Sequence, residues 1–169
     1  MTRSPRFLLQ GALAYGLDVI GTLPPTALGD PTPCPDWDLR ALVGHLVDSL
    51  TVLAGPAGAH RVTTQPVDPV GAFVEAACLL LTRPRAGHPA EDLPALVGAL
   101  EVAVHTWDVT WACQQPRPVP AIIATDLLEL APRIVPDQHR PGLFAAPVAV
   151  PACTPAGDRL VAFLGRHLR

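Results

Sequence analysis

The amino-acid sequence predicts an all-α protein, a four-helix bundle with an extended Pro-rich strap and a short C-terminal helix. Its 169 residues are 49% hydrophobic and 16% charged, which suits one packed core, so a single domain is expected over residues 1–169. The chain contains 21 prolines, and they leave several long windows free. Inside those windows apolar residues recur every three or four positions, the spacing of one helix face.

Proline breaks the interior of a helix, so the stretches that lack it mark the expected helices. The five main proline-free windows are Arg6 to Leu23, Asp36 to Gly55, Val70 to Arg83, Ala95 to Gln115 and Ala121 to Ala131. A shorter sixth window runs from Ala156 to the end of the sequence and predicts a final helix over Asp158 to His167. Joined by Pro-rich loops, the first four windows are long enough to form a four-helix bundle.

The first window begins in a way that resembles a signal peptide, because Arg3 and Arg6 precede an apolar run. Gln10 interrupts that run and Asp18 follows soon after, and no convincing small-residue cleavage site closes it. An ordinary amphipathic helix is therefore expected.

The second and third windows are amphipathic, and the fourth is apolar on most sides. Asp38 stands where it can cap the second helix, whose apolar positions follow helical spacing from Leu39 to Leu53. The fourth window has few positions left for a solvated face, so its helix should lie centrally. After the fifth window, the prolines between Pro132 and Pro155 predict an extended strap over the bundle.

Charge and cysteine usage exclude several classes of partner. Twelve basic residues, all arginine, stand against fifteen acidic ones, for a net charge of −3, so no basic stripe favours nucleic acid. No apolar run is long enough for a membrane span. The four cysteines include no C-x-x-C pair, which argues against a disulfide framework or a zinc knuckle and favours a reducing cytoplasm.

One polar triplet interrupts the apolar fourth helix. Glu101, His105 and Asp108 are spaced i, i+4 and i+7, so they share one helix face. An unpaired buried carboxylate would cost several kcal/mol, so something must neutralise it. One solution is a purely structural Glu101–His105 hydrogen bond. The other is a divalent metal held by Glu101, His105 and a third ligand, His45, from the second helix.

The remaining histidines and cysteines favour ordinary roles. Two histidines and one carboxylate would leave coordination positions open, as in catalytic zinc or non-haem iron sites. Cys78 and Cys113 are expected as small buried hydrophobes. Cys34 could reach the open end of the bundle, but no local base argues for a lowered thiol pKa. The histidines expected in solvent are His60, His88, His139 and His167.

Three blocks of sequence resemble the mycothiol-dependent maleylpyruvate isomerase-like proteins, specifically the single-domain metal-binding branch of the DinB/YfiT superfamily. The first is Thr32-Pro33-Cys34-Pro35-Asp36-Trp37, continued by Leu42-Val43-Gly44-His45-Leu46. The second runs from Glu101 through His105-Thr106-Trp107-Asp108 to Val109. The third comprises Arg140 to Phe144, Val148 to Pro151, and Asp158 to Arg166.

The resemblance implies a DinB-like four-helix bundle with one divalent ion, most often zinc, held by His45, Glu101 and His105. Trp37 and Trp107 are then expected to pack beside the ligands. Asp108 would orient a ligating imidazole, although a role in fixing the neighbouring backbone is equally open. The link from Thr82 to Asp92 looks shorter than in relatives, and no second, C-terminal domain follows here, so the isomerase substrate is not carried over.

Three functions remain open at this stage. The resemblance implies thiol chemistry, in which a zinc-activated low-molecular-weight thiol such as mycothiol, a candidate co-substrate, is used for S-transfer or isomerisation of a small electrophile. A thiol-independent lyase, cyclase or hydrolase of secondary metabolism, or a non-catalytic metal- or ligand-binding module, fits the same residues. Arg133 and Arg140 are candidates for binding a carboxylate substrate, with surface salt bridges as the alternative. Substrate, metal identity and oligomeric state stay open.

Overall fold

The computed structural model describes residues 2–55, 67–82 and 92–168, and within these ranges the chain is helical, as predicted. One isolated bridge joins Pro31 to Asp38 in the same ranges. The α-helices are α1 (Pro5–Ile20), α2 (Leu39–Ala54), α3 (Pro69–Thr82), α4 (Asp92–Ala112), α5 (Ala121–Ile134) and α6 (Ala156–Phe163). Two short 3-10 helices, Pro25–Gly29 and Asp137–His139, lie in the connections.

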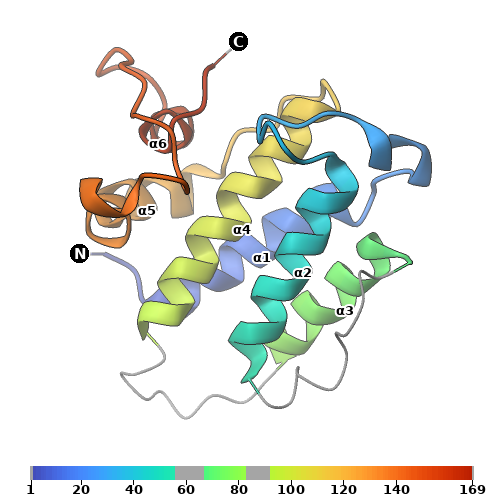
Figure 1. The fold of residues 1–169 in the computed structure, drawn as a ribbon. Coiled ribbons are helices and arrows are strands. Elements are labelled where there is room, and N and C mark those ends of the chain that lie inside the picture. The colour runs from blue at the N-terminus through green and yellow to red at the C-terminus, as the bar shows by residue number, and fades with distance from the viewer. Residues whose placement is uncertain (1, 56–66, 83–91, 169) are drawn as a thin grey trace.

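The first four helices form the predicted bundle (Figure 1). Helix α1 packs most extensively against α4, and α2 packs against both α3 and α4. Buried leucines from α1 and α2, together with Phe73 of α3, fill the space between them. Burial of this apolar surface is the main source of the fold's stability, and it fixes α2 and α4 side by side.

The two helices that carry the predicted metal ligands begin as their sequences suggest. The Asp38 side chain accepts a hydrogen bond of 2.8 Å from the Ala41 amide, which satisfies one of the free N–H groups at the start of α2. Helix α4 begins at Asp92, before the predicted Ala95, because Pro94 lies in the first turn, where a missing N–H costs nothing. Twelve of its 21 residues are buried, so α4 is central as expected.

A close approach of three helices depends on Gly16 of α1. A Cβ atom at this position would lie 2.8 Å from Cζ of Phe73 on α3 and 3.3 Å from a methyl group of Val102 on α4. The missing side chain therefore lets α1 sit close to both neighbours.

The C-terminal part of the chain contains the predicted extended Pro-rich segment and short final helix, with differences in detail. Helix α5 continues through Pro132 to Ile134, since proline in the last turn removes only one hydrogen bond near the helix end. The segment after it packs on α6 and does not simply cross the bundle: the Val148 amide donates to the Ala162 carbonyl at 2.9 Å. Figure 1 shows α5, this segment and α6 as a lobe beside the bundle.

Arg140 holds this lobe together from inside. Its side chain is buried, donates hydrogen bonds to the carbonyls of Ala145 and Phe163 at 3.1 Å each, and stacks over the Phe163 ring. Arg133, by contrast, is exposed on α5. We call residues 135–168 the C-terminal segment.

Among the described residues, no helix combines the length and apolar character that a membrane crossing requires. The expectations for His60, His88, Arg83 and the link between Thr82 and Asp92 fall on residues 56–66 and 83–91, outside the described ranges.

Candidate metal centre and its pocket

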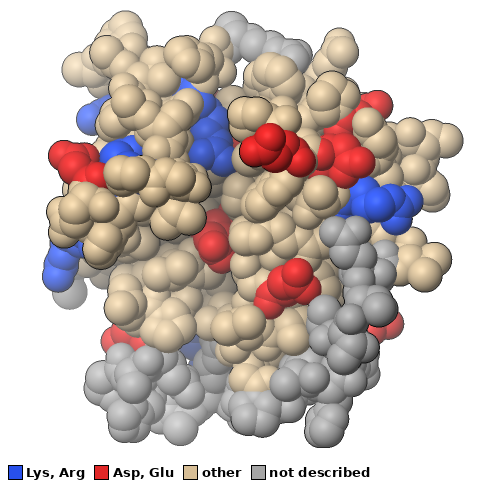
Figure 2. All heavy atoms as spheres, in the orientation of Figure 1, with Lys and Arg blue, Asp and Glu red and all other residues tan. Residues whose placement is uncertain are grey.

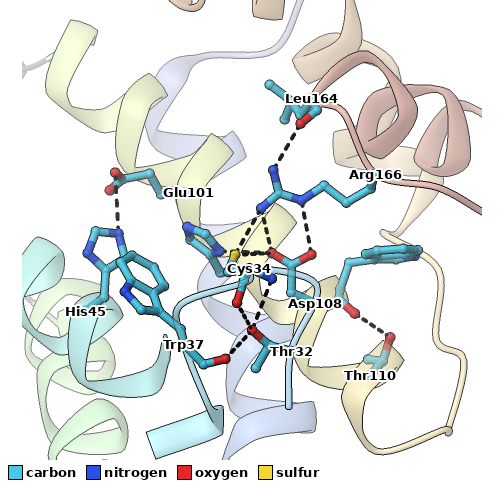
Figure 3. A network of polar contacts seen from close by, with 11 residues as sticks. Thr32, Cys34, Trp37, His45, Glu101, Asp108, Thr110, Leu164 and Arg166 are labelled. Atoms are coloured by element: carbon cyan, nitrogen blue, oxygen red, sulfur yellow. Dashed lines mark hydrogen bonds and ion pairs between the residues drawn. The ribbon is translucent and has the colours of Figure 1, made fainter. Parts of the chain in front are cut away.

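Three potential ligands come from the middle turns of two neighbouring helices, α2 and α4. His45 Nε2 of α2 lies 3.9 Å from Glu101 Oε1 of α4. The rings of His45 and His105 are 5.3 Å apart, edge to face. Helix α4 places Glu101 and His105 one turn apart on the same face. The structure thus gathers the three side chains nominated as metal ligands, and Figure 3 shows His45 and Glu101 facing each other.

His105 is fixed by a carboxylate on its own helix. Its Nδ1 lies 3.0 Å from Oδ2 of Asp108, whose side chain is fully buried. When Nδ1–H donates to the carboxylate, the lone pair of the ring is on Nε2, the arrangement typical of metal-ligating histidines. The purely structural alternative, a Glu101–His105 hydrogen bond, is not what forms here, since His105 pairs with Asp108 and Glu101 faces His45.

Arg166 holds Asp108 from the opposite side. Its Nε donates to Oδ1 at 3.1 Å and its Nη2 donates to Oδ2 at 2.7 Å, two parallel charge-assisted bonds that Figure 3 shows. Burial would raise the pKa of Asp108, but the bonds from His105 and Arg166 outweigh it and hold that pKa below its ordinary range. Asp108 is therefore a carboxylate at neutral pH.

Cys34 reaches this network from the loop before α2. Its Sγ lies 3.7 Å from Asp108 Oδ2 and 3.6 Å from Arg166 Nη2. Thr32 orders the loop by accepting from the Cys34 amide at 3.1 Å and donating to the Trp37 carbonyl at 2.7 Å. Burial, followed by the nearby Asp108 charge, raises the pKa of the Cys34 thiol to about 11. Cys34 is thus a neutral thiol at physiological pH.

Two overlapping donor groups could accept a cation, and they share His105. Ligand atoms of Cys34, His105 and Asp108 lie within 4.8 Å of one another. In this group, however, Arg166 already bonds both oxygens of Asp108, and the thiol keeps its proton. A cation there would lie beside the guanidinium of Arg166, and this repulsion disfavours metal binding by Cys34, His105 and Asp108.

The other group, His45, Glu101 and His105, is gathered less closely, and its one short separation between ligand atoms is that of His45 and Glu101. Its donor types match zinc, whose ligands stand about 3.3 Å apart when each bond is near 2.0–2.1 Å, close to the 3.9 Å between His45 and Glu101. Burial, then the nearby His105, lowers the pKa of His45, so its imidazole is neutral and able to ligate at neutral pH. The donor types of the three residues therefore fit the implied ion, and the His45–Glu101 pair also has a suitable spacing.

A cavity of about 790 Å³ opens beside these side chains, a size that suits a small organic molecule. His45, Glu101 and His105 line it, as does Trp37, whose ring lies 4.7 Å from that of His45. Trp107 instead is buried in the core. The opposite wall comes from the C-terminal segment.

Sequence reasoning missed several residues of this pocket. His139 and His167 are exposed, as expected, yet both line the cavity, and Phe144 and Arg166 join them from the C-terminal segment. No helical spacing could have found these residues, because only the folding of the C-terminal segment onto α4 brings them in. The one available signal was the third resembling block, which includes Phe144 and Arg166.

Comparison with known proteins agrees with this architecture. The model of the mycothiol maleylpyruvate isomerase N-terminal domain matches residues 9–131, most of the chain. The chain belongs to this family. The matched range of the mycothiol maleylpyruvate isomerase N-terminal domain contains His45, Glu101, His105 and Asp108, and it ends before the C-terminal segment that supplies Arg166. The helical fold is consistent with a DinB-like bundle.

Two relatives are uncharacterized proteins of Mycobacterium tuberculosis, MT0763 of strain CDC 1551 and Rv0738 of strain H37Rv. Each is 29% identical over 163 residues, covering 84% of this chain and 86% of the relative. No solved structure matches the chain.

Proposed function

We propose that this protein is a metal-dependent enzyme that uses a low-molecular-weight thiol, mycothiol or a similar one, for S-transfer or isomerisation of a small electrophilic substrate. Membership of the mycothiol maleylpyruvate isomerase N-terminal domain family supports the use of a thiol co-substrate. The observation that carries the proposal is the convergence of His45, Glu101 and His105 at the wall of a cavity large enough for a substrate.

In this proposal each residue has a defined task. His45 and His105 offer imidazole nitrogens, and Glu101 offers a carboxylate that offsets part of the charge of the ion. A bound zinc ion lowers the pKa of a thiol sulfur in its open position, so that the thiol is available as a nucleophile at neutral pH. Asp108 holds His105 in the ligating tautomer, and Trp37 covers the side of His45.

A cytoplasmic location accompanies the proposal, because low-molecular-weight thiols work in a reduced compartment. All four cysteines of the chain are free thiols, which suits that compartment.

The decisive experiment incubates zinc-loaded protein with mycothiol and a panel of small electrophiles, such as activated alkenes and epoxides, and follows thiol consumption. We expect thiol to be consumed by the native protein and not by His45→Ala. As a control, His139→Ala removes an imidazole that lines the cavity outside the proposed ligand set. Turnover without thiol would contradict the proposed role of a thiol co-substrate and favour metal-dependent lyase, cyclase or hydrolase chemistry. Zinc binding without any turnover would instead favour a non-catalytic binding module.

A further inference from the structure

The walls of the cavity are mostly apolar away from the proposed ligands. The apolar lining includes Val97, Leu100 and Val104 of α4, together with Ile134, Phe144 and Leu164 from later in the chain. Such walls gain free energy by contact with apolar ligand surface, by roughly 25 cal/mol for each Å² removed from water.

The charged side chains among the described lining residues also limit which ligands the cavity can bind. The lining has one guanidinium, that of Arg166, and its bonds go to Asp108, Cys34 and the Leu164 carbonyl. Arg140, a candidate for binding a carboxylate substrate, lies outside the lining; its Nη1 donates to two backbone carbonyls, and its Nη2 is buried. Asp36 and Glu101 add negative charge to the lining. Figure 2 shows a face dominated by residues without charge, with acidic side chains near its middle.

We propose that the cavity binds an uncharged ligand with an aliphatic or aromatic body, and that it discriminates against anions. The body lies between α4 and the C-terminal segment, with the polar group of the ligand toward His45, Glu101 and His105. This inference rests on the proposed function only for the statement that this polar end reacts. An anion would enter a site with carboxylates, in which Arg166 is already paired and the other basic groups of the described lining are histidines.

The test compares octan-1-ol with octane-1-sulfonate, which share a chain but differ in charge, and sulfonate is a poor metal ligand. Binding is followed by the fluorescence of the pocket tryptophans, Trp37 and Trp111, in zinc-loaded and in EDTA-treated protein. We expect octan-1-ol to bind at least about tenfold more tightly, equivalent to about 1.4 kcal/mol, in both samples. Equal or tighter binding of the sulfonate, or no binding of octan-1-ol, would overturn the proposal.

A matched pair of variants locates the binding. Val97 and Ile122 are both exposed helical residues, but only Val97 lines the cavity. Val97→Asp should weaken octan-1-ol binding about tenfold, and Ile122→Asp should leave it unchanged. Equal effects of the two variants would place the alcohol outside the cavity. The preference for octan-1-ol over the sulfonate is also measured in EDTA-treated protein, so it does not depend on metal or on thiol consumption. Failure of this inference is therefore distinguishable from failure of the proposed function.

The contacts of Arg166 carry a second inference independently. Arg166 follows α6, yet it grips Asp108 of α4 through two parallel hydrogen bonds, while its Nη1 donates to the Leu164 carbonyl at 3.0 Å. Asp108 in turn contacts His105, so the chain of contacts runs from the C-terminal segment to a proposed ligand. We infer that Arg166 is a positioning residue, which sets the orientation of His105 by fixing the carboxylate plane of Asp108.

Zinc affinity, measured by competition with a chelator, tests this role without any turnover. Arg166→Met should lower the affinity about 10- to 100-fold, the usual effect of disturbing the outer partner of a metal-ligating histidine, because Asp108 loses the bonds that fix it. Arg166→Lys keeps the positive charge but loses the two parallel hydrogen bonds, so its zinc affinity should lie between those of the native protein and Arg166→Met. This variant provides the test if Arg166→Met does not fold.

Arg140→Met is the matched control, since Arg140 anchors the same segment to the Ala145 and Phe163 carbonyls without contacting Asp108. We expect it to lower the melting temperature and to leave zinc affinity within a factor of about two, because outer contacts to the histidine persist. Native zinc affinity in both Arg166→Lys and Arg166→Met, or an equal loss of zinc affinity in Arg140→Met, would overturn the positioning role. Arg166 would then only attach the C-terminal segment to α4.

Discussion

At the scale of single residues, the histidines and acids of the site differ sharply in burial, and burial separates their tasks. Asp108 has no exposed side-chain surface, whereas about a third of the surface of His45 and of Glu101 is accessible. A buried carboxylate needs fixed partners and therefore suits a supporting role. Accessible donors at a cavity wall can exchange water for a ligand, which suits His45 and Glu101 for coordination.

The role of Glu101 can be checked by removing its charge alone. Glu101→Gln should lower zinc affinity, because a neutral amide is a weaker ligand than a carboxylate, while the melting temperature should change little because the side chain is only partly buried. Zinc content after dialysis against a chelator measures the first effect and a thermal scan the second. Glu129→Gln, an exposed site on α5, should retain native zinc content. Unchanged affinity in Glu101→Gln would remove Glu101 from the ligand set.

Cys34 should be a slow nucleophile despite its place in the pocket. Its pKa near 11 leaves little thiolate at pH 7.5, because thiolate forms only as pH rises toward that value. Iodoacetamide should first modify Cys78 and Cys153, which are exposed. Peptide mass mapping over time gives the order. Labelling of Cys34 before these two at pH 7.5 would show that its thiol is activated.

At the scale of secondary-structure elements, the sequence predicted the helices better than their surroundings. Proline gaps and apolar spacing located α1 to α4, and the Asp38 cap of α2 is confirmed, because these signals are local. The end of α5 was predicted at Ala131 and lies at Ile134, since a proline near a helix end costs little. The Arg166–Asp108 contact spans 58 residues of sequence, so no local pattern could reveal it.

The packing of α1 against α3 and α4 is sensitive to volume at Gly16. Gly16→Val would push methyl groups against Phe73 and Val102, and overpacking of this kind typically costs about 1–3 kcal/mol. For a chain of this length each kcal/mol lowers the melting temperature by about 2–4 °C, which calorimetry would detect. Gly29→Ala is the control, because nothing lies within 4 Å of the added carbon. Equal melting temperatures for the two variants would contradict the close approach.

At the scale of the whole molecule, the bundle and the C-terminal lobe are joined by polar contacts at both ends of the chain. Arg166 links the C-terminal segment to α4, and Arg3, just before α1, links the N-terminus to α5. The Arg3 amide and guanidinium both donate to Asp126 Oδ2, at 2.9 and 3.1 Å. These contacts help to fix the lobe that forms the second wall of the cavity.

The Arg3–Asp126 contact predicts a defined pH dependence of stability. The hydrogen bond from the Arg3 amide, outweighing burial and aided by the Arg3 side chain, lowers the pKa of Asp126. A carboxyl group with a depressed folded-state pKa stabilises the fold above its unfolded pKa of about 3.9, and the contribution is lost as pH falls through the folded value. Asp126→Asn should therefore lower the melting temperature at pH 7 and reduce its decline below about pH 4.

Thermal scans of native protein, Asp126→Asn and the exposed-site control Asp48→Asn over this pH range measure the effect. Asp48→Asn should follow the native curve. Parallel curves for native protein and Asp126→Asn would contradict a stabilising role for the ionised carboxylate.

The cavity has a divided origin: its proposed ligands stand on α2 and α4, within the range that matches the family, while the facing wall comes from beyond residue 131. The proposed ligands thus lie in one stretch of the sequence, and part of the wall that would select the ligand lies in another. Exchanging side chains such as Phe144 would alter which compounds are accepted and leave the coordinating atoms in place. A scaffold divided in this way lends itself to acquiring new substrates during evolution, and to being redesigned at the bench.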